Sequence, residues 1–499
     1  TGDSALAAGT TDWYDLTTRT GIKQEYSLSM RQGTEKLQTF ASISAMDNQS
    51  YIEGNTYKRY TGRLNLDYDI LKNLQAGISS SLAYGRNDRA SQAWAGGIGT
   101  AMSNGLPYYQ PDDPNHQFTN PVRQEQFVDW RSVELRSINT VRLEYTPVKN
   151  LRLSANGSYD YMDLSDSFLE DSVWTNFFTI GKDWATQVNN WNGNVFGQYD
   201  FNMLPEDHRL SFMAGGEAQR SETNSSYMEV TDVNNHLYLD WEGTENSDTI
   251  STVNPRDAFS FISGFSRVNY MLKNKYVAKA SIRVDGSSKF GRNNRYGVFP
   301  ALGAGWIVSE EGFWSERMRT KVNYFKLKAS YGVTGNASIG SFQRFGTFSS
   351  RDNNIQYNND SIIFPIRLEN PDLSWETTTT IDAGFEIGIL NDRVTAEFSV
   401  YNKESRDVLL DTRVQTSTGF ATFLQNVGQV RNRGIELGIT SYNMTGPFRW
   451  RTTLNIAHNR NQVIDVGTTP PDALQGSGDT RVVEGEPDRV NYLVRFSHE

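Results

Sequence analysis

Few side chains in this chain of 499 residues have the types and spacing that covalent chemistry or metal binding requires. The five histidines show no HExxH motif and no paired spacing, so we predict no metal site built on them. They are His116, His208, His236, His458 and His498. No serine lies in a G-x-S-x-G elbow, so we predict no catalytic residues and a protein that is not an enzyme. The chain has no Cys, which excludes disulfides and Cys-ligated metals.

Two further segments resemble ion or phosphate sites only in part. Residues Asp352 to Asp360 (DNNIQYNND) are rich in oxygen ligands, but they lack the spacing and the glycine of an EF-hand loop. The segment Gly96 to Gly99 (GGIG) lacks the third glycine and the strand-turn-helix context of a phosphate-binding fingerprint. We therefore predict a polar loop at Asp352 to Asp360, with ion binding as the less favoured alternative, and no phosphate site at Gly96 to Gly99; overall we predict no cofactor and no metal.

Aromatic residues in polar, Gly-rich or Pro-containing segments are the candidate ligand-binding residues. They are Trp94, Tyr108, Tyr109 and Trp174. Their rings could stack on sugars or contact a partner protein, because aromatic faces suit both uses. The alternative is that they pack within their own loops or anchor the chain at a membrane edge. The sequence leaves both interpretations open.

The elements that would position these loops are strands with two different faces. Between Phe448 and Ala457, apolar and polar side chains take alternate positions along the chain. One face carries Phe448, Trp450, Leu454 and Ile456, and the other carries Arg449, Arg451, Thr453 and Asn455. The same alternation recurs at 151–161, 276–285, 394–400 and 435–440. This period of two predicts strands that lie between an apolar medium and water.

The connections between these strands alternate in length. Short ones, rich in turn residues, lie at 33–36, 71–73, 147–150, 204–208, 272–275, 390–393 and 445–447. Long polar segments lie at 87–132, 166–182, 223–256, 336–373, 410–426 and 463–490. Strict alternation places all long loops at one end, as in outer-membrane barrels. We therefore predict an all-β fold, a transmembrane antiparallel β-barrel of about sixteen strands, with no second domain and no helical stretch.

Composition is compatible with such a barrel. The mean hydropathy is −0.58, and no run of about 18 apolar residues is present, so we predict no transmembrane helix. A spanning strand needs only about 9–11 residues, half of which are polar. The net charge of −10 is spread along the chain without a basic stripe, so we predict no nucleic-acid partner.

Strand direction adds an expectation about the ends of the chain. If the short turns are periplasmic, the first strand, at about 23–31, runs inward from the outside. A barrel normally begins and ends on the periplasmic side. We therefore expect another strand before Thr1 and more strands after Glu499.

Several segments resemble the SusC/RagA-type TonB-dependent outer-membrane transporters of Bacteroidetes. The matching stretches are Lys275 to Trp314, Phe325 to Asn336 (FKLKASYGVTGN), Asn370 to Glu376 (NPDLSWE), Tyr401 to Leu410, and Asn426 to Gly438 (NVGQVRNRGIELG). Thr11-Asp12-Trp13 and Gly33 to Lys36 also resemble the family, whereas Arg489 to Glu499 depart from it. The resemblance covers nearly the whole chain.

The resemblance implies a barrel of 22 strands filled by an N-terminal plug. On this basis residues 1–499 are one partial barrel domain, from which the plug, the first strand and the last strands are absent. The implied partners are a SusD-like surface lipoprotein, the TonB-ExbB-ExbD energising complex, the lipid bilayer, and a second transporter-lipoprotein pair in a dimer. We expect mid-strand charges such as Arg283 to pair with a plug or with neighbouring strands rather than to bind substrate.

The function implied is TonB-dependent import of a bulky nutrient, an oligosaccharide or a peptide, across the bacterial outer membrane. Two alternatives remain from the sequence. One is an outer-membrane barrel of another class, such as a porin or an assembly factor. The other is a soluble surface glycan-binding β protein, which would have shorter strands and connections without alternation of length.

Overall fold

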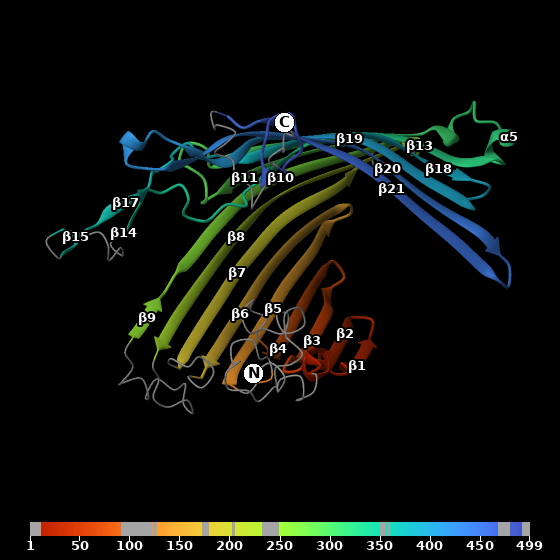
Figure 1. The fold of residues 1–499 in the computed structure, drawn as a ribbon. Coiled ribbons are helices and arrows are strands. Elements are labelled where there is room, and N and C mark those ends of the chain that lie inside the picture. Colours follow the sequence, from red (N-terminus) through yellow and green to blue (C-terminus); the bar gives the residue numbers. More distant parts are fainter. Residues whose placement is uncertain are drawn as a thin grey trace, which may run out of the picture. The chain divides into compact units, whose positions relative to one another are not determined.

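The computed structural model describes residues 11–90, 122, 127–171, 179–201, 205–231, 249–349, 356–357, 360–467 and 480–491. Within these ranges, every helix is too short or too polar to span a bilayer. The helical elements are α1 (Trp13–Thr17), η3 (Val308–Glu310), α5 (Glu316–Arg319) and η4 (Thr416–Thr418). Nearly everything else that is regular is antiparallel β structure (Figure 1).

The main elements are sixteen strands of twelve or more residues. They are β1 (Ile22–Gly33), β2 (Leu37–Gln49), β3 (Thr56–Leu71), β4 (Leu74–Asp88), β5 (Val128–Val148), β6 (Leu151–Glu170), β7 (Ile180–Phe201), β8 (His208–Thr231), β10 (Arg256–Leu272), β11 (Tyr276–Ser287), β12 (Tyr296–Ile307), β13 (Val322–Asn336), β18 (Glu376–Ile389), β19 (Val394–Arg413), β20 (Thr422–Thr445) and β21 (Arg449–Asp465). The predicted number of about sixteen is confirmed for the part of the chain that the structure describes.

Short strands lie in the long connections. They are β9 (Thr249–Val253), β14 (Thr347–Ser349), β15 (Gln356–Tyr357), β16 (Asp360–Ser361), β17 (Phe364–Arg367), β22 (Thr480–Arg481) and β23 (Val490–Asn491). β14 pairs with β17, β15 with β16, and β22 with β23, each antiparallel.

The structure confirms the positions of most of the predicted turns. Strands end and restart at Gly33/Leu37, Leu71/Leu74, Val148/Leu151, Leu272/Tyr276, Ile389/Val394 and Thr445/Arg449. Left-handed backbone closes several of them, with φ of 74° at Asn150 and 54° at Asn274. In the predicted turn at 204–208, residue 204 lies outside the described residues.

Two expectations were wrong in detail. The chain does contain helices: Asp12 caps α1 by accepting hydrogen bonds from the backbone N–H groups of Tyr14 (3.0 Å) and Asp15 (3.2 Å). Several long connections are also shorter than expected, because the strands beside them continue further, whereas the connection between β13 and β18 covers the whole predicted segment 336–373. β19 runs to Arg413 and β20 starts at Thr422, within the segment assigned to a loop at 410–426.

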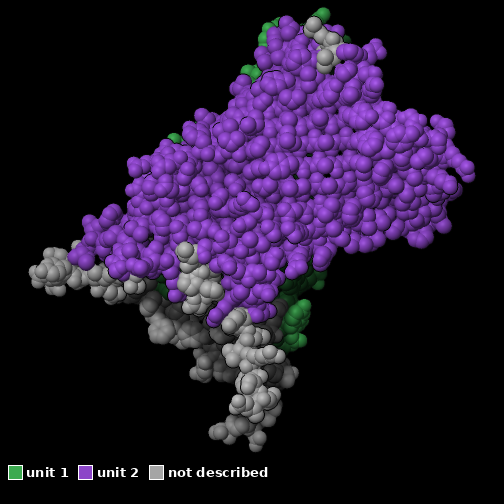
Figure 2. All heavy atoms as spheres, turned by 90° about the horizontal axis from the view of Figure 1, so that it is seen from above, with its two compact units in different colours: residues 1–145, 154–193, 219–258 green, residues 146–153, 194–218, 259–499 purple. Residues whose placement is uncertain are grey.

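The chain divides into two compact units (Figure 2). Unit 1 contains residues 1–145, 154–193 and 219–258, and unit 2 contains residues 146–153, 194–218 and 259–499. In unit 1, β1 to β5 pair in sequence order as an antiparallel meander (Figure 1). In unit 2, β10 to β13 and β18 to β21 pair in the same manner.

The meander β1–β5 of unit 1 has an apolar face and a polar face. The apolar face carries, among others, Tyr60, Gly62, Leu64, Leu66 and Tyr68 and their cross-strand partners. Ile43 and Leu82, the partners of Gly62, are 63 % and 52 % exposed. The polar face carries ion pairs between strands. These pairs include Arg142 with Asp67 (2.6 Å) and Arg136 with Asp160 (2.8 Å).

A buried aromatic cluster in unit 2 joins several connections to the strands. It consists of Phe290, Phe299, Leu373 and Trp375, with exposed fractions of 0 to 8 %. The Trp375 indole N–H donates to the carbonyl of Arg295 at 3.1 Å, which fixes the ring. This cluster is formed by the segments that carry the family resemblance, so those motifs pack against one another.

Candidate functional site

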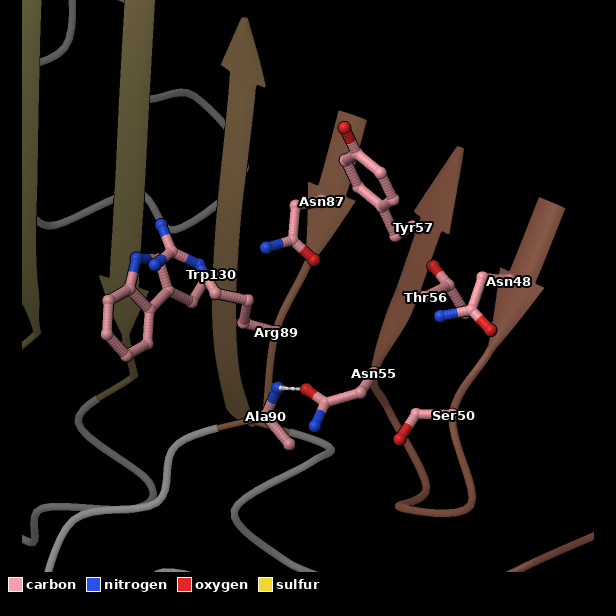
Figure 3. A pocket seen from close by; sticks show the side chains of 9 residues that line it. All are labelled: Asn48, Ser50, Asn55, Thr56, Tyr57, Asn87, Arg89, Ala90 and Trp130. Carbon is pink, nitrogen blue, oxygen red and sulfur yellow. Dashed lines mark hydrogen bonds between the residues drawn. The ribbon is translucent and has the colours of Figure 1, made fainter. Parts of the chain in front are cut away.

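A cavity of about 410 Å³ lies on the polar face of unit 1 (Figure 3). It is at the strand ends that lead into the segment after β4. Its lining residues are Asn48, Ser50, Asn55, Thr56, Tyr57, Asn87, Arg89, Ala90 and Trp130. Strand pairing aligns three of them, because Asn48 is the partner of Tyr57 and Tyr57 is the partner of Asn87. The cavity is therefore built on the sheet itself.

Arg89 and Trp130 form one wall of the cavity. The guanidinium carbon of Arg89 lies 4.3 Å from the centroid of the Trp130 ring, a cation–π arrangement. The Arg89 backbone N–H donates to the Trp130 carbonyl at 2.8 Å, which holds the two residues side by side. Phe168 supports the indole edge-on, at 5.9 Å between ring centroids. The ring is thus fixed from several directions.

The charge of Arg89 is balanced within the site. Its Nη2 atom donates to the carboxylate of Asp166 and to the hydroxyl of Ser132, and Ser132 also donates to Asp166. Because the ion pair satisfies the guanidinium charge, the cavity does not select an anionic ligand by charge alone.

Two donors of this wall lack a partner among the described residues. The Trp130 indole N–H and the Arg89 Nε atom are both buried and make no hydrogen bond there. An unpaired buried donor costs free energy, so a ligand or water that accepts from it is favoured. The remaining lining is dominated by amides and hydroxyls, which both donate and accept. This arrangement suits hydrogen bonding to a neutral polar chain.

The turn between β2 and β3 forms the opposite rim. Gly54 has a φ of 78°, a left-handed backbone that favours glycine. Arg19 ties the turn together by donating to the carbonyls of Ser50 (3.0 Å) and Asn55 (3.3 Å) and by pairing with Glu53 (3.2 Å). The Asn55 side chain then accepts from the Ala90 N–H at 2.6 Å, as Figure 3 shows. The rim is therefore linked to the end of β4.

The candidate aromatics from the sequence are not part of this description. Trp94, Tyr108, Tyr109 and Trp174 lie outside the described residues. Trp130 was missed because it lies at the edge of a long segment expected to be irregular. A polar, aromatic strand end could have been inferred from two stretches of the sequence, Tyr-Lys-Arg-Tyr at 57–60 and Arg-Asn-Asp-Arg at 86–89.

Histidines and carboxylates form no alternative site in the described ranges. His208 lies at the start of β8, where its Nδ1 atom is 2.7 Å from the Tyr270 hydroxyl. No group of three or more His, Cys, Asp or Glu side chains in the described ranges is placed to hold a metal ion. His116, His236 and His498 lie outside these ranges, as do most of the residues from Asp352 to Asp360.

Comparison with known proteins gives one consistent result. Residues 216–480 match the family model described as TonB dependent receptor-like, beta-barrel. TonB-dependent receptor P26 of Formosa agariphila is 27 % identical, over 97 % of this chain and 50 % of its own length. TonB-dependent receptor SusC of Bacteroides thetaiotaomicron is 26 % identical, over 92 % of this chain and 49 % of its own length. The chain therefore spans about half the length of these relatives.

The fold is also shared with a solved structure of the RagAB peptide transporter. The TM-score is 0.84 at 22 % identity, over 96 % of this chain and 55 % of that chain. At this identity the likeness concerns the fold.

Proposed function

Because the chain belongs to the β-barrel family of TonB-dependent receptors, and is of the SusC/RagA type, we propose that it forms the wall of an outer-membrane importer of bulky, neutral nutrients. The family membership confirms the resemblance carried by the sequence motifs, and it confirms the all-β, antiparallel barrel class. The family performs transport rather than covalent chemistry.

The observation that carries the proposal is the cavity beside Trp130 on the polar face. In a barrel whose apolar face meets lipid, the polar face meets the lumen. The cavity lies at the ends of β2 to β5, where the long connection after β4 begins. Long connections are extracellular in this class of barrel. The cavity would then be at the outer mouth of the lumen, where an arriving substrate is first held.

The substrate we propose is an oligosaccharide or a peptide. Both present alternating donors and acceptors, which the amides of Asn48, Asn55 and Asn87 can match. Both also present surfaces that pack on an indole ring. We further propose that a SusD-like lipoprotein delivers the substrate and that the TonB-ExbB-ExbD complex energises its release into the periplasm, in keeping with the families of the relatives.

The test is ligand retention by the full-length protein, purified with its partner from the outer membrane of its host. Asn48→Ala combined with Asn87→Ala removes two hydrogen-bonding amides from the cavity. At about 1 kcal/mol each, their loss lowers affinity roughly 30-fold. Mass spectrometry of small molecules released by denaturation measures how much co-purified oligosaccharide or peptide remains.

The matched control is Asn139→Ala, which removes an amide from the apolar face of the same unit. Asn139 is the strand partner of Ser80, whose hydroxyl donates to it at 2.7 Å. The control should retain as much ligand as the natural protein. Equal retention by the double variant would refute the site. An outer-membrane fraction without the protein, or no heat-modifiable migration in detergent, would refute the importer.

A further inference from the structure

Two arginines face each other on β20 and β21, on the side of the unit 2 sheet that carries exposed apolar residues. Arg433 and Arg460 are cross-strand partners. Ile435 and Ile456 lie on the same face by strand alternation, and they are 47 % and 52 % exposed. Like charges in directly opposed positions destabilise a sheet. An anion between the two guanidinium groups would remove that cost.

Neighbouring carboxylates do not supply this anion. Arg433 donates through its Nε atom to the side-chain oxygen of Asn402 at 2.9 Å, and among the described residues neither arginine forms an ion pair. The carboxylate of the next row is Glu404, which Arg406 (2.7 Å) and Arg431 (3.1 Å) already share. Four cations thus surround one carboxylate. We call these cations the arginine patch: Arg406, Arg431, Arg433 and Arg460.

Other carboxylates lie further towards these strand ends. They are Asp407, Asp465, Glu484, Glu486 and Asp488. Within the described ranges, no ion pair links any of them to the arginine patch. Asp465 accepts from the Gly467 backbone N–H at 2.7 Å, and Glu484 accepts from that of Val466 at 3.0 Å. The space between Arg433 and Arg460 therefore keeps its positive charge.

Unit 1 differs, because each cation near the corresponding strand ends has a carboxylate of its own sheet. Lys58 lies 3.8 Å from Asp47. Asp88 lies 3.0 Å from Arg86 and 3.3 Å from Arg131. Those cations are compensated within the chain, whereas the opposed arginines of unit 2 require an external anion.

The arginine patch lies at one edge of an apolar band. Trp450, at the start of β21, is 52 % exposed and shares a face with Leu454, Ile456 and Arg460. Trp450 and Arg460 are ten positions apart, about 33 Å along a strand and about 25 Å across a bilayer at a tilt of about 40°. That span matches the apolar band of a transmembrane barrel. Because short turns such as 446–448 are periplasmic in this class of barrel, the patch would lie at the extracellular boundary of the bilayer.

We propose that the arginine patch binds a phosphate group of lipid A, between Arg433 and Arg460. The outer leaflet of a bacterial outer membrane consists largely of lipopolysaccharide, whose lipid A carries phosphate above its acyl chains. Guanidinium groups bind phosphate oxygens through two parallel N–H donors, which suits the opposed pair. The proposal rests on the proposed function, because it requires this face to meet the outer membrane.

The apolar residues beside the patch select a lipid rather than free phosphate. Ile435 lies two residues from Arg433 on the same face, and Ile456 lies four residues from Arg460. Their exposed side chains offer contact to aliphatic carbon directly below the phosphate position. Free phosphate would use only the arginines, whereas lipid A uses both parts of the face.

The experiment titrates lipid A into the full-length protein, purified in detergent and washed free of lipopolysaccharide. Native mass spectrometry measures the lipid A concentration at half occupancy. Arg433→Gln combined with Arg460→Gln should raise this concentration about 30-fold, the effect of removing two cations at a membrane surface. Lipid A from which the phosphates have been removed should bind the natural protein as weakly as intact lipid A binds the double variant.

Lys403→Gln is the matched control, because it removes a cation from the opposite face of the same sheet. Lys403 follows Asn402 on β19, and its ammonium lies 5.2 Å from the centroid of the Tyr401 ring. This variant should bind lipid A as the natural protein does. Inorganic phosphate in large excess should leave lipid A bound, and displacement by it would assign the patch to the free ion instead.

Equal binding of lipid A by the double variant, or equal binding of the dephosphorylated lipid, would overturn the site. Tighter binding of phosphatidylglycerol than of lipid A would overturn the choice of lipid. Heat-modifiable migration of the same samples separates these failures from failure of the proposed function. Its loss in the natural protein would refute the barrel and the site together, whereas intact migration with equal binding would refute the site alone.

Discussion

At the scale of single residues, Glu311 is the carboxylate with the clearest electrostatic role outside the strands. It lies just after η3 and accepts hydrogen bonds from the Tyr276 hydroxyl, the Trp306 indole (3.0 Å) and the Lys275 ammonium (3.1 Å). These donors, Tyr276 foremost, lower the pKa of Glu311 to about 2. The carboxylate thus ties the turn after β12 to the start of β11.

This pKa predicts how stability depends on pH. A depressed folded-state pKa stabilises the fold above the unfolded value of 4.5, and that stabilisation is lost as pH falls towards about 2. Glu311→Gln should therefore lower the urea midpoint of unfolding at pH 7, and the difference from the natural protein should shrink between pH 4.5 and 2. Tryptophan fluorescence in detergent measures both midpoints. Glu310→Gln, at the exposed neighbouring position, is the control, and an equal effect in both variants would contradict the prediction.

At the scale of elements, local periodicity predicted the strands but not the site. The alternation at 448–457 and 276–285 is a property of neighbouring residues, so it locates β21 and β11 without knowledge of the fold. α1 and α5 were missed because five and four residues are too few to show a helical period. The cavity could not be predicted, because Asn48 and Trp130 are brought to one face by pairings across more than 80 residues of sequence.

Arg283 pairs with carboxylates of the strands, as expected for a mid-strand charge. Arg283 on β11 pairs with Glu217 at 3.0 Å and with Asp285 at 2.6 Å. Its carboxylate partners are therefore on a nearby strand and on its own strand. From the sequence, both a plug and the neighbouring strands were possible sources of carboxylate partners for Arg283. Only the register of strand pairing determines which carboxylates lie within reach.

The aromatic cluster of unit 2 leads to a prediction about β13. A Cβ atom at Gly335 would collide with the rings of Phe299 and Trp375, which are buried and held in place. Gly335→Ala should therefore destabilise the protein by about 1–3 kcal/mol, the usual effect of overpacking. Gly332→Ala, on the same strand, is the control, because its Cβ would meet Ala301 at an ordinary 3.5 Å. Urea unfolding measures the stability of both variants. Equal unfolding midpoints would show that the cluster accommodates the added methyl group without loss of stability.

At the scale of the whole molecule, the division into an apolar and a polar face is what family membership requires of the chain. Leu64 and Asn65 are neighbours on β3 with opposite orientations. Leu64 lies midway between Tyr60 and Tyr68 on the apolar face. The Asn65 side chain accepts from Ser79 at 2.7 Å on the polar face, where Arg63 also lies. The same substitution at these two positions therefore samples lipid and lumen at nearly the same depth.

Arginine at the middle of a lipid-facing strand costs about 2–4 kcal/mol, whereas a lumen position tolerates it. Leu64→Arg should accordingly reduce the amount of full-length, heat-modifiable protein in the outer-membrane fraction. Asn65→Arg should leave the amount close to that of the natural protein, although the substitution removes one exposed hydrogen bond. The measurement is the ratio of compact to heat-denatured bands on gels of purified membranes. If both variants assembled equally well, the apolar face would not meet lipid at this depth, and the assignment of the polar face to the lumen would fail with it.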